Sequence, residues 1–138
     1  QTGLIWLKNA NCVGRTLNWN KAFMFATTLG SGTNVCSTEP KNLTDRSSKG
    51  DWRLPTIKEL QSLVHYGFIN PALPNTDGTG KWVKDQPFSG VEMNYYWSST
   101  TYAGRRGNAW GVGLSNGYVN ASVKSGTYSV WAVRSGKK

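Results

Sequence analysis

Sixteen glycines among 138 residues favour a chain with many turns over one built from long helices. Seven tryptophans and an aromatic content of 12% supply the apolar surface of an ordered core, so this is not the composition of a disordered tail. The length suits one domain, residues 1–138, that buries roughly two-thirds of its unfolded surface. No run of eighteen apolar residues occurs, and we therefore expect no insertion into a membrane.

Two segments in the first half have the apolar spacing of helices. Thr16 can cap the start of the first and Gly30 can end it, and its apolar residues recur at steps of three and four: Trp19, Ala22, Phe23, Ala26 and Leu29. The second begins with a capping-box pattern between Thr56 and Glu59 and ends at Gly67. Its apolar stripe consists of Leu60, Leu63 and Val64.

Strands are expected at the beginning and in the last third of the chain. Residues 4–7 form a short apolar run, and a late β-meander is predicted at residues 95–102, 108–114, 118–124 and 128–134. Asn116-Gly117 predicts a hairpin turn between the middle two strands. Gly111 and Gly113 inside a strand indicate the close approach of another backbone. Together these patterns predict an α+β fold, with two helices packed on a mostly antiparallel sheet.

Cys12 and Cys36 are the two cysteines of the chain. An even count in a Trp- and Gly-rich chain that starts with Gln1 favours one disulfide in a secreted product or excised domain. The alternative is two buried free thiols in a cytosolic protein. Two cysteines and one histidine do not make a four-ligand zinc site without carboxylates.

Sixteen Lys and Arg residues against seven acidic ones give a formal charge of +9, which favours polyanionic partners. Arg105 and Arg106 stand out because they are adjacent, lie between glycines and fall between two predicted strands, where their planar forks suit sulfate or phosphate. The further candidate ligand-binding residues are Lys81, Lys84, Asn120, Lys124, Lys137 and Lys138. The alternative is that each is a solvated surface group and that the charge aids solubility.

Three short motifs occur in a fixed order. Residues 50–56 read GDWRLPT and lead to Glu59-Leu60, residues 96–100 read YWSST, and residues 130–134 read VWAVR. This set resembles the family named for the C-terminal domain of the Legionella collagen-like adhesin (Lcl), and the resemblance covers nearly the whole chain.

The resemblance implies a C-type-lectin-like fold, with the terminal strands joined in one sheet and a second small sheet bearing the ligand face. It also implies a trimeric head on a collagen-like stalk, secreted or on the bacterial surface, that binds sulfated glycosaminoglycans such as heparin-like chains. We expect the motif residues to support the fold: Asp51, Trp52, Arg53, Pro55, Thr56, Glu59, Trp97, Ser98 and Ser99.

An enzyme would need groups that the sequence does not place together. His65, the one histidine, is expected inside the second helix, and it is the only base available to Ser98 or Ser99. We therefore predict no catalytic residues and no cofactor.

Calcium is not expected either. Glu39-Pro40-Lys41 has a lysine where the sugar-binding pattern needs an amide, and residues 75–78 are typical of a turn. Two further alternatives to glycan binding stay open. The first is a structural or protein-binding head, and the second is a nucleic-acid-binding module, which the expected disulfide and the lack of a known motif disfavour.

Overall fold

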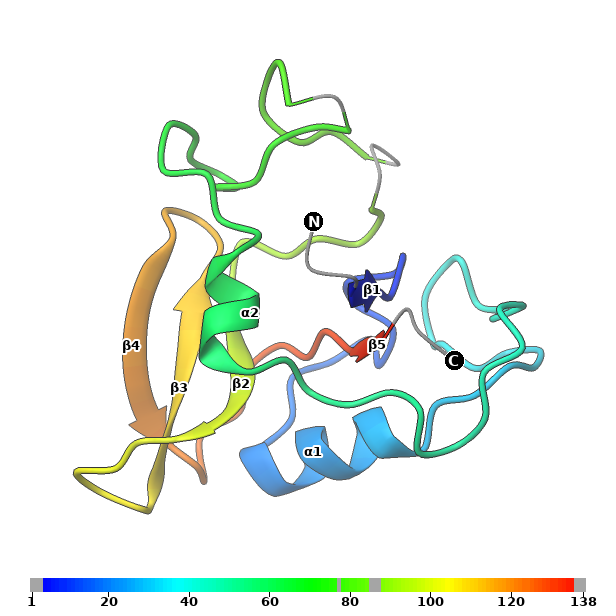
Figure 1. Ribbon diagram of the computed structural model, residues 1–138, viewed down its shortest axis with the longest axis horizontal. Helices are drawn as coiled ribbons and strands as arrows, with labels where there is room; N and C mark the ends of the chain where they lie inside the picture. Colours follow the sequence, from blue (N-terminus) through cyan, green and yellow to red (C-terminus); the bar gives the residue numbers. More distant parts are fainter. Residues whose placement is uncertain (1–3, 77, 85–87, 136–138) are drawn as a thin grey trace.

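The computed structural model describes residues 4–76, 78–84 and 88–135, and it contains two short helices and two antiparallel sheets (Figure 1). This confirms the α+β prediction. Within the described residues, no helix is long and apolar enough to cross a membrane. The elements are β1 (Leu4–Trp6), α1 (Trp19–Thr27), α2 (Ile57–Gln61), β2 (Tyr95–Thr101), β3 (Asn108–Gly113), β4 (Tyr118–Val123) and β5 (Val133–Ser135).

The two ends of the chain meet in a small sheet of β1 and β5, in which Leu4 pairs with Ser135 and Trp6 with Val133. The prediction of a fourth meander strand at residues 128–134 was therefore wrong. Only Val133–Ser135 is a strand, and it pairs with β1. The physical reason is that the backbone of residues 128–132 bonds in turn to Leu17, to β2 and to Leu7, so no single neighbouring strand runs along it.

The second sheet has the order β2-β3-β4 and matches the predicted first three strands of the meander. The β3–β4 hairpin turns over residues 114–117, with Gly113 paired to Tyr118 and Gly117 at a φ of +80°. A Cβ at Gly111 would clash with the carbonyl oxygen of Tyr96, so the predicted close approach is present there. At Gly113 the nearest atom would be 3.8 Å away, and the same prediction was wrong.

The first helix is shorter than predicted at both ends. Its N-cap is Asn18, whose side chain accepts a hydrogen bond from the Lys21 backbone N–H. Thr16 does not cap it, because the backbone of Leu17 is still paired with that of Tyr128 and the chain turns helical only after it. The helix ends at Thr27 and not at Gly30.

The second helix has the predicted capping box, with Thr56 bonded to the Glu59 N–H and the Glu59 carboxylate bonded to the Thr56 N–H. It ends at Gln61, so Leu63, Val64 and His65 lie beyond it. The expectation that His65 is helical was wrong. Its N–H donates to the carbonyl of Ala72 at 2.9 Å, which folds the chain back at this point.

Buried tryptophans fill the space between the sheets, α1 and the irregular segments. Trp52, Trp97 and Trp131 are each at most 1% exposed. Their indole N–H groups donate to Ser47 Oγ, to the Leu17 carbonyl and to the Leu7 carbonyl at 2.7–2.9 Å. The core therefore holds irregular backbone by hydrogen bonds as well as by apolar contact.

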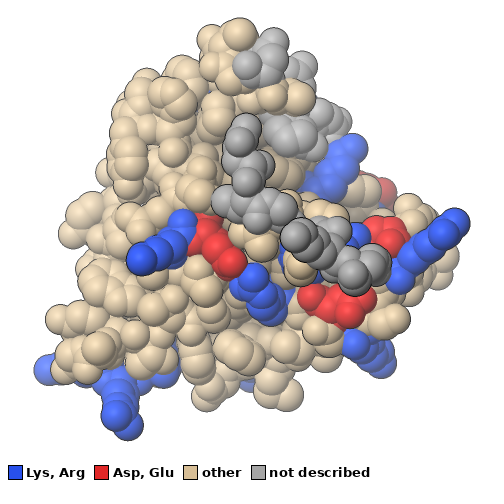
Figure 2. Space-filling model, in the orientation of Figure 1, with Lys and Arg blue, Asp and Glu red and all other residues tan. Residues whose placement is uncertain are grey.

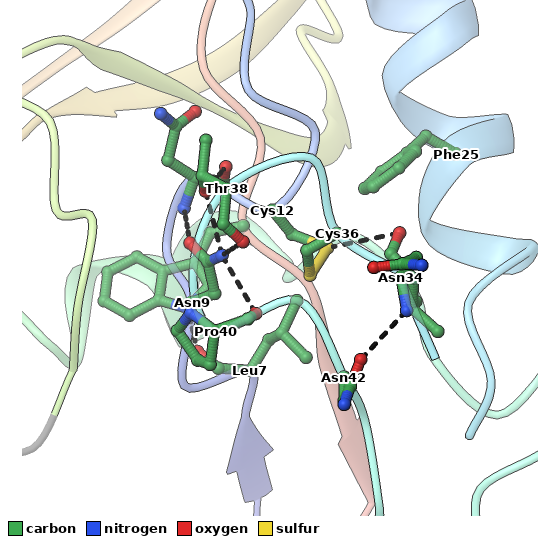
Figure 3. Close-up of a disulfide and its surroundings, with 12 residues drawn as sticks. Leu7, Asn9, Cys12, Phe25, Asn34, Cys36, Thr38, Pro40 and Asn42 are labelled. Carbon is green, nitrogen blue, oxygen red and sulfur yellow. Dashed lines mark hydrogen bonds between the residues drawn. A yellow bond between two sulfur atoms is a disulfide. The ribbon is translucent and has the colours of Figure 1, made fainter. Parts of the chain in front are cut away.

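The predicted disulfide between Cys12 and Cys36 is present, and both residues are buried (Figure 3). It anchors the loop after α1 to the segment after β1. The Ser37 N–H donates to the Cys12 carbonyl at 2.7 Å, and Asn9 Nδ2 donates to the carbonyl and hydroxyl of Thr38, both at 2.9 Å. The disulfide and these bonds hold two irregular segments together.

Replacing both cysteines with serine (Cys12→Ser with Cys36→Ser) should lower the free energy of unfolding by about 3 kcal/mol, because the unfolded chain gains the freedom of an open loop. Urea denaturation of the double variant and of the parent under oxidising conditions measures the difference. A loss under 1 kcal/mol would mean that the neighbouring hydrogen bonds hold this loop without the crosslink.

Candidate functional site

The Arg53 guanidinium and the Glu59 carboxylate form two parallel hydrogen bonds, of 2.7 and 2.9 Å. Glu59 also accepts the Thr56 N–H, while the backbone of Arg53 pairs with that of Val133. The hydrogen bond between Arg53 and Glu59 raises the pKa of the arginine and lowers the pKa of the carboxyl group. This part of the GDWRLPT motif therefore joins α2 to the C-terminal strand.

The other residues of this motif also bond within the fold. Asp51 accepts the Ser48 N–H at 2.9 Å, and the buried Trp52 donates to Ser47. Pro55 is fully buried, and its carbonyl accepts the Ser99 N–H at 2.7 Å.

The YWSST motif lies on β2 and contacts the first motif. Trp97 is buried, and the Ser98 hydroxyl donates to the Trp110 carbonyl at 2.6 Å. Thr100 Oγ1 accepts the N–H of Ile57, the first residue of α2. Together with the bond from Ser99 to Pro55, this contact joins α2 to β2, so the two motifs form one structural unit.

Asp45 and Arg134 form a second ion pair, with 2.8 Å between Asp45 Oδ2 and Arg134 Nε. The other carboxylate oxygen accepts hydrogen bonds from the Ser47 N–H, the Ser47 hydroxyl and the Ser31 hydroxyl. Burial acts to raise the pKa of Asp45, but the hydrogen bonds from Ser47, Arg134 and Ser31 outweigh it and lower the pKa to about 2.

The groups considered for catalysis have structural partners. His65 is exposed, accepts the Gly67 N–H through Nδ1 at 3.0 Å and lies against the Phe68 ring. Ser98 is buried and bonded to a backbone carbonyl. In the part of the chain that the structure describes, no three His, Cys, Asp or Glu side chains gather in a group that could hold a metal ion. Asp77, in the turn weighed as a calcium ligand, lies outside the described residues.

Arg105, Arg106 and Lys124 lie together at one corner of the molecule, which we call the basic corner. Both arginines are exposed in the turn between β2 and β3. This turn is closed by backbone bonds from the Arg105 N–H to the Tyr102 carbonyl and from the Asn108 N–H to the Arg105 carbonyl. It therefore presents two neighbouring guanidinium groups on an ordered backbone.

Lys124 joins this turn to the start of α1. Its backbone N–H donates to the Gly107 carbonyl at 2.8 Å, and its carbonyl accepts the Trp19 N–H at 3.0 Å. The ammonium group lies 4.1 Å from the centre of the Trp19 ring and donates to Thr101 Oγ1 at 3.0 Å. Lys124 therefore connects the turn to the helix start, and in Figure 1 both lie in the lower part of the molecule with the segment after β4 between them.

The basic corner is built from parts of the chain that carry no acidic residue. All seven Asp and Glu residues lie between positions 39 and 92, whereas α1, the β2–β3 turn and Lys124 come from residues 1–38 and 93–138. Figure 2 shows Lys and Arg atoms over the β2–β3 turn at the lower left, with no described Asp or Glu atoms beside them on this face. The positive charge of the basic corner is therefore not neutralised by acidic residues close to it in the sequence.

The other predicted ligand residues are not gathered here. Lys81 and Lys84 are exposed on a segment in the upper part of Figure 1, opposite the β2–β3 turn. Lys84 lines a separate hollow with Lys8 and Glu39. Asn120 is exposed on β4, and its amide oxygen accepts the N–H of the following residue. Lys137 and Lys138 lie outside the described residues.

Comparison with protein families gives a match to the model of the Lcl C-terminal domain over residues 1–134. The chain belongs to this family. Comparison with curated proteins finds no match. Membership makes the chain a surface adhesin-related domain, and it agrees with the motif resemblance seen in the sequence.

In this Lcl C-terminal domain, an apolar surface beside Lys124 of the basic corner was not predicted from the sequence. Trp19 and Phe23 were assigned to the apolar stripe of the first helix, but Phe23 is 40% exposed and Met24 is 66% exposed. Trp19, Phe23 and Met24 line a shallow hollow of about 380 Å³ together with Asn20. Helical spacing alone does not indicate that Phe23 and Met24 are exposed, because whether they are covered depends on segments that are remote in the sequence.

The stability of this Lcl C-terminal domain should fall in acid through Asp45. A carboxyl group with a lowered pKa in the folded state contributes stability above the pKa of the unfolded state, and this contribution is lost as the pH falls from about 4 towards 2. Asp45→Asn should remove about 2 kcal/mol at neutral pH and flatten the acid loss. Urea denaturation of both proteins from pH 6 to 2 measures this, and parallel stability curves would contradict the assignment.

Proposed function

We propose that this domain is the ligand-binding head of a surface adhesin and that it holds sulfated or otherwise polyanionic glycans through the basic corner. The observation that carries the proposal is the meeting of Arg105, Arg106 and Lys124 on a part of the surface built from acid-free segments. The proposed activity is binding without chemical change of the ligand, with no catalytic residue and no cofactor.

Arginine suits this role because its planar fork donates two parallel hydrogen bonds to a sulfate or carboxylate. Such contacts are weak one at a time, since an exposed ion pair contributes at most about 1 kcal/mol. Three cations on one head therefore give modest affinity, and strong attachment requires a ligand with repeated charges and a head with repeated sites.

The C-type-lectin-like assignment and the trimer belong to this proposal. The pairing of β1 with β5 and the separate β2-β3-β4 sheet agree with the arrangement expected from the family resemblance. A trimer would present three basic corners to one chain, and linked sites raise avidity by roughly a hundredfold or more. The Cys12–Cys36 disulfide supports a location outside the cell and disfavours a nucleic-acid-binding role.

Reversing the charge of both arginines (Arg105→Glu with Arg106→Glu) should weaken binding to heparin roughly 30-fold, because two favourable ion pairs become repulsive. The double variant should also elute from a heparin column at lower salt than the parent. The matched control is Lys49→Glu with Lys58→Glu, which changes the net charge equally at two exposed lysines outside the basic corner.

If both double variants lose the same affinity, binding follows the overall charge and the basic corner is not the site. Elution of the parent at or below physiological salt would contradict glycan binding itself. Cell attachment that persists after enzymatic removal of surface glycans would favour a structural or protein-binding head.

Light scattering of the full-length protein should give three times the mass of its single chain if the head is trimeric. Surface plasmon resonance should then show roughly hundredfold tighter binding to long heparin chains than to short fragments. A monomeric mass, or equal affinity for long and short chains at matched charge density, would contradict the multivalent model.

A further inference from the structure

An apolar hollow opens directly beside the basic corner. It is lined by Trp19, Asn20, Phe23 and Met24, and its volume is about 380 Å³. Phe23 lies 5.3 Å from Trp19 between ring centres, and both Phe23 and Met24 expose much of their side chains. Large apolar groups that gather in an exposed hollow, next to uncompensated cations, are typical of a ligand site.

Two polar groups at this place, the Trp19 indole N–H and the Lys124 ammonium, are bonded to the protein. The indole N–H of Trp19 donates to the Ser98 carbonyl at 2.9 Å, and Lys124 covers one side of the Trp19 ring. Phe23 and Met24 therefore offer a ligand apolar contact, while Lys124 and the two arginines offer charge. Because the Lys124 ammonium lies 4.1 Å from the centre of the Trp19 ring, a ligand that contacts both the hollow and Lys124 needs an apolar face with an anionic group close to it.

We propose that the hollow takes the ring of one sugar residue of the sulfated glycan, with its C–H face against Phe23 and Met24. Sulfate or carboxylate groups on that residue and on the next then pair with Lys124 and with the Arg105–Arg106 turn. This inference rests on the proposed function and adds to it a reason for preferring sugar chains over other polyanions.

Sugar chains fit this surface better than a chain of phosphates. A pyranose ring has one or both faces formed by C–H groups, and its substituents carry sulfate at the ring edge. Burying a C–H face against an exposed aromatic ring removes apolar area from water on both partners. Polyphosphate has the charge but no such face, so it gains nothing from Phe23.

The two kinds of contact respond differently to salt. Ions screen the contacts of Lys124, Arg105 and Arg106, whereas they do not screen the apolar contact of Phe23 and Met24. The inference therefore predicts that glycan binding retains a component at high salt that belongs to the hollow.

Isothermal titration calorimetry of the full chain with a size-defined heparin oligosaccharide, and separately with inorganic polyphosphate, tests the proposal. Phe23→Ser should weaken oligosaccharide binding roughly three- to tenfold at every salt concentration and leave polyphosphate binding unchanged. Met24→Ser, at a more exposed position, should act in the same direction. Ile69→Ser is the matched control, because Ile69 is 60% exposed and lies in the segment beyond α2.

Thermal unfolding of each variant establishes that it is folded before its binding is compared. If Phe23→Ser and Met24→Ser bind the oligosaccharide like the parent, or weaken polyphosphate binding by the same factor, the hollow is not a sugar site. The hollow is also not a sugar site if Phe23→Ser weakens binding to vesicles of anionic lipid but leaves binding to the oligosaccharide unchanged. Each of these results leaves the proposed function standing, because that function is tested separately, by binding of the parent at physiological salt and by the Arg105→Glu with Arg106→Glu variant.

Discussion

The hydrogen bond from a buried indole to a remote backbone carbonyl is the interaction on which this domain depends. Trp131 reaches the carbonyl of Leu7, and Trp97 reaches the carbonyl of Leu17. Much of the described chain lies outside helices and strands, so its buried carbonyls need partners that secondary structure does not supply. A tryptophan supplies one donor and a large apolar ring together, and it can therefore bury an irregular segment without leaving a carbonyl unpaired.

The same interaction determines where the basic corner lies. Because Trp97 holds Leu17 against β2, the chain enters α1 beside Ser98 of β2 and the end of β4. Trp19 then bonds to Ser98 and to Lys124, which in turn bonds to the β2–β3 turn. Trp19 and Lys124 thus connect the basic corner on the surface to the core, and these contacts fix its position.

The sequence was informative where structure depends on near neighbours. The strand predicted at residues 118–124 and the capping box at Thr56 each correspond to a real element, because the pattern and the interactions lie within a few residues. It failed where distant segments decide the outcome. The end of the chain pairs with β1 and not with the meander, α2 stops after Gln61, and Asn18 takes the place of Thr16 as the cap.

The candidate site shows the same division. Arg105 and Arg106 were recognisable from adjacent charge between glycines, but nothing in the sequence indicated that Lys124 lies over Trp19 or that Lys81 and Lys84 lie elsewhere. Phe23 has the spacing of a core residue and is half-exposed, because the core closes on Ala22 and Ala26 of the same helix. Which face of a short helix is buried depends on the partner that packs against it, and no local pattern identifies that partner.

The β2–β3 turn is closed by its own backbone bonds, and its two arginines are exposed. Residues there can consequently be exchanged during evolution at little cost to the rest of the domain. On the proposed function, substitutions at this tip would change which ligand the same scaffold prefers. The motif residues that join α2 to β2 and to β5 would keep their contacts.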